Sequence, residues 1–248
     1  MVCLHGMWGF ALIYQFWFAL GEMLGIKMFS IELPGHTKEL NCSGLDKQTI
    51  KSYVRIVDDV IRSCIGDCIL VGWSMGAVIS RHVAKQNLCV KKVVLITSPP
   101  PPGVFFSLKV QLMMIKYGVW LILGKPFRLT PDDAAEFAFN RGFTDQECDA
   151  FIAELNPESG RAARDVTLAQ FAFWEMKRKK FRCPMLVVAG EFDALTPVAL
   201  QRKMAERYIG AEYREIPGAC HSIMLQPVVR EIAFRDITGW VYDMPKAA

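Results

Sequence analysis

Apolar and polar positions along the chain alternate between short strand-like runs and longer helical segments. Apolar runs of strand length recur at 1–5, 27–32, 68–73, 91–97, 184–190 and 213–216. Segments with helical spacing lie between the early runs, at 10–24, 47–64 (with an expected cap near Asp46) and 77–85. Strands that alternate with helices are typical of a mostly parallel, doubly wound sheet, so we expect an α/β fold.

This alternation stops at residues 98–103, which read Ser-Pro-Pro-Pro-Pro-Gly. Four consecutive prolines can neither continue a strand nor form a helix interior, so the chain is expected to leave the sheet here. The following residues have no strand pattern and predict four helices, at 104–123, 131–140, 144–154 and 160–178. Strand patterns return at Pro184. We therefore predict a core of residues 1–98 and 182–248 and an inserted helical cap of residues 99–181.

A glycine-rich turn joins the strand at 68–73 to the helix that follows it. It reads Gly72-Trp73-Ser74-Met75-Gly76, with a glycine two positions before and two positions after a serine. In so tight a turn the serine backbone is strained, its hydroxyl stands out from the sheet, and side chains at the glycine positions would collide. The pentapeptide alone also fits an ordinary glycine-rich turn. The strand before it and the helix after it favour a nucleophile elbow, with Ser74 as the nucleophile.

A serine nucleophile needs a histidine base, and the chain has only four histidines. His5 and His36 precede Ser74, which conflicts with the order serine, acid, histidine expected for an elbow of this type. His82 lies about two turns along the helix that the elbow opens, so its ring cannot fold back onto the serine. His221 remains. It follows a short strand and is predicted as the base, in preference to an ordinary surface-loop histidine.

The acid that orients this histidine is expected in the loop after the buried run 184–190. Asp193 stands in that loop, farther from the strand end than its rival Glu191. Thr196 and Pro197 suit the cap and the first turn of the next helix. We predict that Asp193 holds the histidine tautomer and stabilises the imidazolium, with a turn or capping role as the alternative.

An oxyanion hole needs two backbone N–H groups aimed at the developing alkoxide. One is expected from Met75, the residue after the nucleophile. The other is expected from the loop after the first strand, His5-Gly6-Met7-Trp8-Gly9. Met7 is the predicted second donor, with Trp8 as the alternative.

Together these landmarks resemble the alpha/beta-hydrolase superfamily, specifically its small cap-bearing carboxylesterase-like branch. The matching pieces are Leu4-His5-Gly6-Met7-Trp8-Gly9, Glu32-Leu33-Pro34-Gly35-His36, Gly72-Trp73-Ser74-Met75-Gly76, Gly190-Glu191-Phe192-Asp193 and Gly218-Ala219-Cys220-His221. They span nearly the whole chain in the family's order. The resemblance implies a mostly parallel sheet with helices on both faces and a helical cap inserted after the strand that follows the elbow helix.

Two features depart from the family's pattern. Glu32 stands where an aspartate is usual. The chain also starts at the oxyanion strand, so the sheet is expected to lack the usual leading strands and to have an exposed edge.

Composition fits one α/β domain with an insertion. The 248 residues are enough for a large core, and 52% of them are hydrophobic. The formal net charge of +4 is unclustered apart from Lys177-Arg178-Lys179-Lys180, which we interpret as a solvated helix end, so no nucleic-acid partner is expected. The eight cysteines lie apart and form no Cys-x-x-Cys pair, which favours reduced core thiols, no metal site and a cytoplasmic location.

Two apolar stretches bear on membrane contact and on the substrate. Residues 7–20 follow no basic region, and residues 104–123 are interrupted by Lys109 and Lys116, so neither predicts a targeting segment or a stable membrane insertion. The second stretch has more apolar residues than one buried helix face holds, so a surplus is expected in the acyl site. The predicted substrate-binding residues are Trp8, Phe106 and Trp120, with Phe171, Phe173 and Trp174 as further candidates.

The residues and the resemblance predict a serine hydrolase that cleaves uncharged carboxylic esters of short to medium acyl chain through an acyl-enzyme, without a cofactor. Thioesterase, lactonase, carbon–carbon bond hydrolase and cofactor-free haloperoxidase activities use the same triad and stay open. Epoxide hydrolases and haloalkane dehalogenases are disfavoured, because those relatives use an aspartate where Ser74 stands. A non-catalytic member that keeps an apolar pocket is the alternative from another class, and the oligomeric state is left open.

Overall fold

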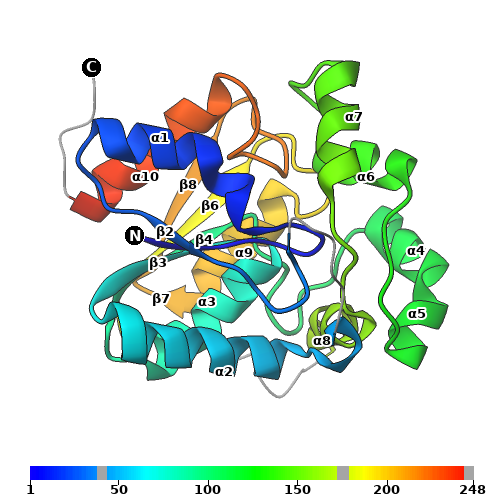
Figure 1. Cartoon of the computed structure of the whole chain (residues 1–248), viewed down its shortest axis with the longest axis horizontal. Coiled ribbons are helices and arrows are strands. Elements are labelled where there is room, and N and C mark those ends of the chain that lie inside the picture. The colour runs from blue at the N-terminus through cyan, green and yellow to red at the C-terminus, as the bar shows by residue number, and fades with distance from the viewer. Residues whose placement is uncertain (38–43, 172–178, 243–248) are drawn as a thin grey trace.

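A six-stranded parallel sheet forms the centre of the computed structural model, which describes residues 1–37, 44–171 and 179–242 (Figure 1). The strands are β1 (Val2–Leu4), β2 (Phe29–Ile31), β3 (Cys68–Trp73), β4 (Val90–Ile96), β6 (Met185–Gly190) and β8 (Glu212–Ile216). They lie in the order β2-β1-β3-β4-β6-β8, and each neighbouring pair is parallel. The α/β sheet predicted from the sequence is confirmed.

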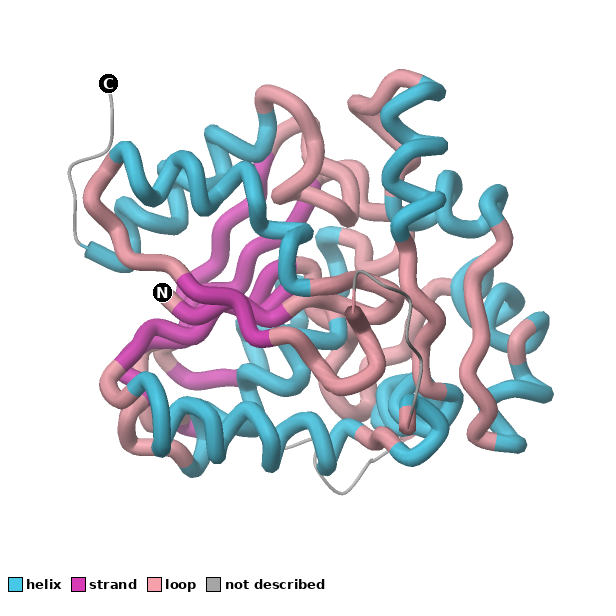
Figure 2. The backbone as a smooth tube through the Cα atoms, viewed as in Figure 1, coloured by secondary structure: helices cyan, strands magenta, loops and turns pink. Residues whose placement is uncertain are grey.

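Helices cover both faces of this sheet (Figures 1 and 2). One face carries α1 (Gln15–Met23) and α10 (Val229–Tyr242), and the other carries α2 (Ile50–Val60), α3 (Met75–Gln86) and α9 (Val198–Arg207). Successive strand residues point to opposite faces: Val94 and Ile96 belong to the core under α1 and α10, while Val93 and Leu95 belong to the core under α2 and α3. Because both faces are buried, the central strands are continuous apolar runs.

The edges of the sheet are less buried than its centre. All six residues of β6 are buried, whereas β2 and β8 are mixtures of buried and partly exposed positions. β2 lies at one edge of the described sheet, where Phe29 is 54% exposed.

Between β4 and β6 the described residues form helices that lie beside the sheet, at the right in Figure 1. They are α4 (Leu108–Lys116), α5 (Gly118–Leu123), α6 (Pro131–Ala138), α7 (Asp145–Glu154) and α8 (Gly160–Ala169). The prediction of one helix over 104–123 is wrong, since helical backbone starts at Leu108 and is interrupted at Tyr117. The Tyr117 hydroxyl bonds to Asp133 and to the N–H of Thr130, so this residue anchors α6 instead of continuing the helix.

Other predicted helix starts shift by a few residues. Asp46 lies in a 3₁₀ turn, and α2 starts after Thr49, whose side chain forms a reciprocal capping box with Ser52. The helix predicted over 10–24 is α-helical only from Gln15. Short 3₁₀ helices lie at Ala11–Tyr14 and Leu45–Lys47, and a π-helical turn lies at Ile61–Ile65.

A second, two-stranded sheet lies outside the main one. It pairs β5 (Lys179–Lys180) with β7 (Tyr208–Ile209) in parallel. The expectation of no strand within 104–181 is therefore wrong at the end of that range. Phe181, next to β5, packs edge-on against Tyr208 with ring centroids 5.4 Å apart, which brings this segment to the end of α9.

The last predicted helix of the insertion is shorter than expected, because α8 ends at Ala169 and not at residue 178. The candidates Phe173 and Trp174, and half of the basic run, Lys177 and Arg178, lie outside the described residues. Within the described part of the chain, the helices are too short or too polar to cross a membrane.

Candidate active site

Ser74 occupies a sharp turn between β3 and α3. Its backbone has φ 53° and ψ −120°, a conformation that costs a non-glycine residue about 1–3 kcal/mol. A Cβ atom on Gly72 would lie 2.3 Å from the carbonyl oxygen of Gly76, and one on Gly76 would lie 2.3 Å from the carbonyl oxygen of Leu4 in β1. The turn therefore closes against the helix and the neighbouring strand only because glycine occupies both positions.

His221 and Asp193 form a buried pair. Nδ1 of His221 lies 2.9 Å from Oδ2 of Asp193, and both side chains are shielded from solvent. Their loops follow β8 and β6. Because the strands are parallel, these loops lie at the carboxyl ends of the strands, as Ser74 does after β3. The Ser74 side chain and the His221 ring line one cavity, although no hydrogen bond joins these two described residues. Catalytic hydrogen bonds of this kind often tighten only when substrate binds.

Asp193 is held by three donors from the residues that follow it. Oδ1 accepts hydrogen bonds from the N–H groups of Leu195 at 2.8 Å and Thr196 at 2.7 Å, and Oδ2 accepts one from the Thr196 hydroxyl at 2.7 Å. The predicted helix cap at Thr196 is wrong, because α9 starts at Val198 after Pro197 and the Thr196 side chain binds the carboxylate instead. These bonds fix the carboxylate with Oδ2 against the imidazole.

Glu191, the rival acid, contacts the histidine loop at a different point. Its side chain is exposed, and Oε2 accepts a 2.8 Å hydrogen bond from the N–H of Gly218. Glu191 thus braces the turn that precedes His221. Of the two carboxylates, Asp193 is the one in contact with the imidazole.

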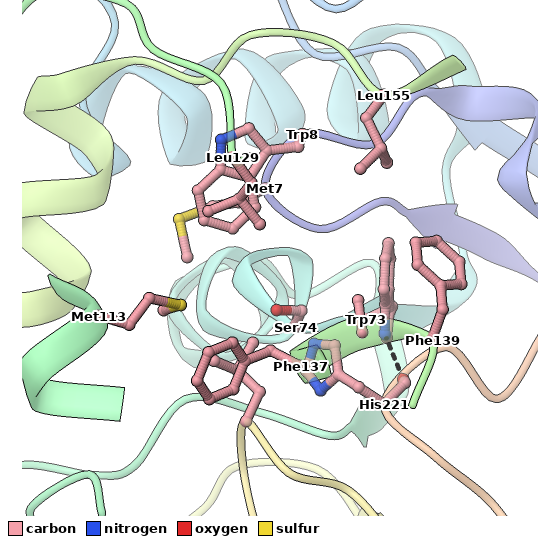
Figure 3. Close-up of a pocket in the computed structure, with 12 residues that line it drawn as sticks. Met7, Trp8, Trp73, Ser74, Met113, Leu129, Phe137, Phe139, Leu155 and His221 are labelled. Atoms are coloured by element: carbon pink, nitrogen blue, oxygen red, sulfur yellow. Dashed lines mark hydrogen bonds between the residues drawn. The ribbon is translucent and has the colours of Figure 1, made fainter. Parts of the chain in front are cut away.

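The backbone around His221 is held from inside the core. Nε1 of Trp73 donates to the carbonyl oxygen of His221 at 2.9 Å, and the two rings lie 5.5 Å apart (Figure 3). The buried side chain of Gln226 accepts from the N–H of Cys220 and donates to the carbonyl of Gly218, both at 2.8 Å. Burial raises the pKa of the Cys220 thiol to about 12, so this neighbour stays protonated and is a poor nucleophile.

Sequence reasoning missed the roles of Trp73 and Gln226. Their partners lie 148 residues away and in the adjacent turn, respectively. Trp73 reads in the sequence only as part of the elbow pentapeptide, and Gln226 carries no motif. A long-range partner of this kind becomes visible only once the strands have been placed.

The loop after β1 lies against the elbow. A Cβ atom on Gly6 would lie 2.8 Å from the Cβ of Ser74, so glycine here permits the close approach. Within the described chain, the backbone N–H groups of Met7 and Met75 have no protein acceptor. Both could donate to a substrate oxyanion. The N–H of Trp8 likewise has no acceptor among the described residues, so Met7 stays a prediction with Trp8 as its alternative.

Residues from the inserted segment bind the loop of residues 5–9, which carries the predicted oxyanion donor and is called the oxyanion loop below. Trp8 has φ 60°, and its carbonyl oxygen accepts a 2.7 Å hydrogen bond from the N–H of Asn156. The Asn156 side chain is fully buried, and its Nδ2 donates to the carbonyl of Gly9 at 3.5 Å. The strained conformation at Trp8 is therefore supported by a contact that comes from outside residues 1–98.

A buried ion pair fastens the same inserted segment to the loop after β2. Nε2 of His36 lies 3.1 Å from Oε2 of Glu158, and neither side chain is exposed. Oε1 of Glu158 accepts hydrogen bonds from the N–H of Ser159 at 2.6 Å and the hydroxyl of Tyr53 at 3.4 Å. Burial alone would lower the pKa of His36, but the adjacent Glu158 carboxylate raises it overall. The His36 ring also lies 4.9 Å from the ring of His5 at the start of the oxyanion loop.

Glu32, which departs from the family's usual aspartate, also serves this region. Both of its carboxylate oxygens lie 3.1 Å from the N–H of Ala11, and Oε1 lies 3.2 Å from Nε2 of His5. The longer side chain thus reaches the first turn after the oxyanion loop. We interpret Glu32 as a residue that holds the backbone at Ala11, just after the oxyanion loop.

A small cavity lies over Ser74 and His221 (Figure 3). Its volume is about 20 Å³, which is room for about one water molecule. Apart from Ser74 and His221, its wall is apolar or aromatic. The other lining residues are Met7, Trp8, Trp73, Met113, Leu129, Phe137, Ala138, Phe139, Leu155 and Leu195.

Of the three predicted substrate-binding residues, Trp8 lines this cavity and the other two do not. Phe106 is buried beside a separate groove between α4, α5 and α8, and Trp120 is 42% exposed on α5. Phe137 and Phe139, at the end of α6, contribute the aromatic wall instead. The sequence missed them because the pattern over 131–140 predicts a helix without saying which face meets the site.

Neither a disulfide nor a metal-binding cluster is found in the described part of the chain. Its seven cysteines are free thiols. Within the same residues, no three or more His, Cys, Asp or Glu side chains are grouped so that they could hold a metal ion.

Several solved structures share the fold of this chain at low sequence identity. A methylesterase from Arabidopsis is 16% identical with a TM-score of 0.73, and the match covers 98% of each chain. A monoacylglycerol lipase from Paleococcus ferrophilus is 20% identical with a TM-score of 0.73, over 98% of this chain and 94% of that one. An esterase from Thermogutta terrifontis is 17% identical with a TM-score of 0.70, over 98% of this chain and 89% of that one.

Sequence comparison assigns the family directly. No curated protein matches the chain. The family model described as "Alpha/beta hydrolase family" matches residues 1–231, most of the chain and all of the elements that surround the candidate site. The chain therefore belongs to the alpha/beta hydrolase family.

Proposed function

We propose that this chain is a carboxylesterase-type serine hydrolase. The observation that carries the proposal is the strained Ser74 turn, which faces the same cavity as the Asp193–His221 pair. Nucleophilic acyl transfer needs this combination of a serine hydroxyl that lines a cavity and an oriented imidazole. Structural neighbours described as a methylesterase, an esterase and a monoacylglycerol lipase are consistent with the same class of reaction.

In the proposed reaction, the Ser74 hydroxyl attacks the ester carbonyl while Nε2 of His221 takes its proton. Asp193 holds Nδ1 and stabilises the imidazolium, and the N–H groups of Met7 and Met75 donate to the oxyanion. Collapse of the tetrahedral intermediate breaks the carbon–oxygen bond, and His221 gives its proton to the leaving alcohol. Water, deprotonated by His221, then attacks the acyl carbon. The bond from this carbon to the Ser74 oxygen breaks, His221 returns the proton to that oxygen, and the acid is released. No metal or organic cofactor takes part in these steps.

The cavity supports an uncharged substrate with a short to medium acyl chain. Its wall offers no charged side chain to pair with an anionic substrate, and its volume of about 20 Å³ accepts only a small group without adjustment. Met7 and Met113 line it, and methionine side chains change shape more easily than branched ones. Each acyl methylene that enters adds about 0.8 kcal/mol of apolar burial, so the rate should rise with chain length until the wall no longer gives way.

Residues 99–181 are proposed to act as the cap over a catalytic core of residues 1–98 and 182–248. Part of the cavity wall over Ser74 and His221 comes from this segment, through Met113, Leu129 and Phe137. The free thiols of the described cysteines support a reducing, cytoplasmic location as a further part of the proposal.

The test combines a labelling reagent with a substrate series. A fluorophosphonate probe should label the wild-type chain and not Ser74→Ala, and p-nitrophenyl esters from acetate to palmitate should be cleaved fastest at short to medium length. Absence of labelling in a folded protein would favour a non-catalytic ligand-binding member of the fold. Labelling with faster turnover of thioesters or lactones than of matched esters would keep the nucleophile and overturn the substrate class.

A further inference from the structure

The outer side of α4 and α5 is covered by large apolar side chains. Figure 1 shows these two helices at the outer edge of the molecule, with the sheet on the opposite side. Six of their residues are between 58% and 75% exposed, and we call this set the α4–α5 apolar face: Leu108, Leu112, Ile115, Val119, Ile122 and Leu123. A helix surface that faces water normally carries polar residues, so this face is suited to a partner.

Helical spacing shows that this exposure is organised. Leu108, Leu112 and Ile115 lie at intervals of four and three residues, so they form one stripe along α4. The opposite stripe of α4 is buried, and its Met113 lines the cavity over Ser74. One helix therefore contacts the candidate active site on its inner side and presents an apolar stripe on its outer side.

An open groove extends the apolar face. It lies between α4, α5 and α8, has a volume of about 410 Å³, and includes Ile115 and Ile122 from the face. Leu168 and Phe171, both partly exposed, form its far wall. A groove of this kind accommodates flexible hydrocarbon as readily as rigid protein side chains.

Charge along the same segment is of one sign. Residues 99–131 contain Lys109, Lys116, Lys125 and Arg128 and no acidic residue. Lys109 pairs with Glu136 through two exposed side chains, whereas Lys116 lies 2.6 Å from Asp133, whose side chain is only 14% exposed. An exposed pair contributes little, so Lys109 can exchange its partner for a phosphate group.

We propose that the α4–α5 apolar face docks on the surface of an anionic lipid bilayer. An amphipathic helix with apolar residues on one side and basic residues at its border lies in the headgroup region of such a membrane. The helices involved are too short to span it, so the docking is peripheral. Lipid-soluble molecules would then be concentrated beside the helix that separates the membrane from the cavity.

The test is co-sedimentation of the full chain with vesicles of phosphatidylcholine alone or of phosphatidylcholine with phosphatidylserine. The wild-type chain should bind the anionic vesicles about tenfold more tightly than the neutral ones, and raised salt should weaken the binding. The double variant Leu112→Glu/Ile115→Glu should lose about tenfold or more of the anionic-vesicle binding. The matched control is Leu88→Glu, since Leu88 is 68% exposed but lies after α3, outside this face, and binding should stay within about twofold.

Circular dichroism of each variant checks that it folds, and Ile122→Glu serves as the second probe if the double variant does not. Equal binding by wild type and face variants would overturn the proposal, as would equal loss in Leu88→Glu. A dimer in sedimentation equilibrium that the face variants dissociate, with no vesicle binding by wild type, would overturn it in favour of contact between two copies of the chain.

Discussion

The two sides of the candidate site depend on the inserted segment to different degrees. On the histidine side, the hydrogen bonds of His221 itself come from Asp193 and Trp73, within residues 1–98 and 182–242. The inserted segment bonds only to neighbouring residues there: Ala138 accepts from the Cys220 thiol at 3.5 Å, and Asn140 donates to the carbonyl of Phe192 at 3.0 Å. On the oxyanion side, the loop at Met7 and Trp8 is fixed by Asn156 and, through His36, by Glu158. Both of these last residues belong to the inserted segment.

This difference separates two functions that usually act together. In the proposed reaction, proton transfer depends on the imidazole, whose own hydrogen bonds come from the core. Stabilisation of the oxyanion would depend on a loop whose strained residue, Trp8, is bonded directly to the insertion. Movement of residues 99–181 should therefore disturb the proposed oxyanion hole more than the Asp193–His221 pair.

The largest effect is expected on the histidine side. Asp193→Asn should lower kcat by a factor on the order of 10⁴, because the amide favours the wrong imidazole tautomer. Glu191→Gln is the matched control: it removes a neighbouring exposed carboxylate that contacts Gly218 and should change kcat little. Steady-state kinetics on a p-nitrophenyl ester measure both. Full activity in Asp193→Asn with a large loss in Glu191→Gln would assign the acid to Glu191.

On the oxyanion side, Met7→Pro removes one donor and should lower kcat by roughly 10²–10³. Met7→Ala keeps the N–H and should retain appreciable activity, since only a cavity-lining side chain is lost. The comparison of the two variants separates the backbone donor from the side chain. A folded Met7→Pro protein with wild-type kcat would move the donor to Trp8.

The sequence predicts the parts of this site that depend on local backbone geometry. Ser74, Gly72 and Gly76 follow from one strand–turn–helix pattern. The steric reason for Gly72 is local, since a Cβ there would meet the carbonyl of Gly76, whereas the reason for Gly76 is the carbonyl of Leu4 in the neighbouring strand β1. Asp193 and His221 follow from strand ends and from the order of residues along the chain. The sheet is likewise predictable, since buried parallel strands are continuous apolar runs.

The features that the sequence misses depend on packing between distant segments. A helical pattern over 131–140 cannot say that Phe137 and Phe139 face the cavity, nor could the apolar excess on α5 say that Trp120 faces outward. His36 and Glu158 are 122 residues apart, and nothing near either one indicates a pair. Side-chain direction relative to other elements, and not helix formation, is what sequence periodicity leaves undetermined.

The link between the insertion and the core should be measurable as stability. Glu158→Gln keeps the size of the side chain but removes the charge that faces His36, and we expect it to lower the free energy of unfolding by about 1–3 kcal/mol. Because the same segment supports Trp8, kcat should fall by about tenfold with a smaller change in KM.

The control is Glu154→Gln, which changes an exposed acidic residue on α7 and should leave the free energy of unfolding and kcat unchanged. Urea unfolding and ester kinetics test these outcomes, and a stability loss without any change in kcat would mean that the pair does not position the oxyanion loop.

The smallest expected effect is a pH dependence of this link. The groups that face His36 are the Glu158 carboxylate, the Tyr53 and His5 rings and, more weakly, Glu32. Because the pKa of His36 is raised in the folded chain above its ordinary value of 6.5, the stability that it contributes is fully present below that value. It is lost as the pH rises through the raised folded pKa.

The gap in unfolding free energy between wild type and Glu158→Gln should therefore be wider at about pH 6 than at about pH 9, measured by urea titration at each pH. A gap that stays constant or widens toward high pH would show that His36 is neutral in the folded chain and that Glu158 acts only as a hydrogen-bond acceptor.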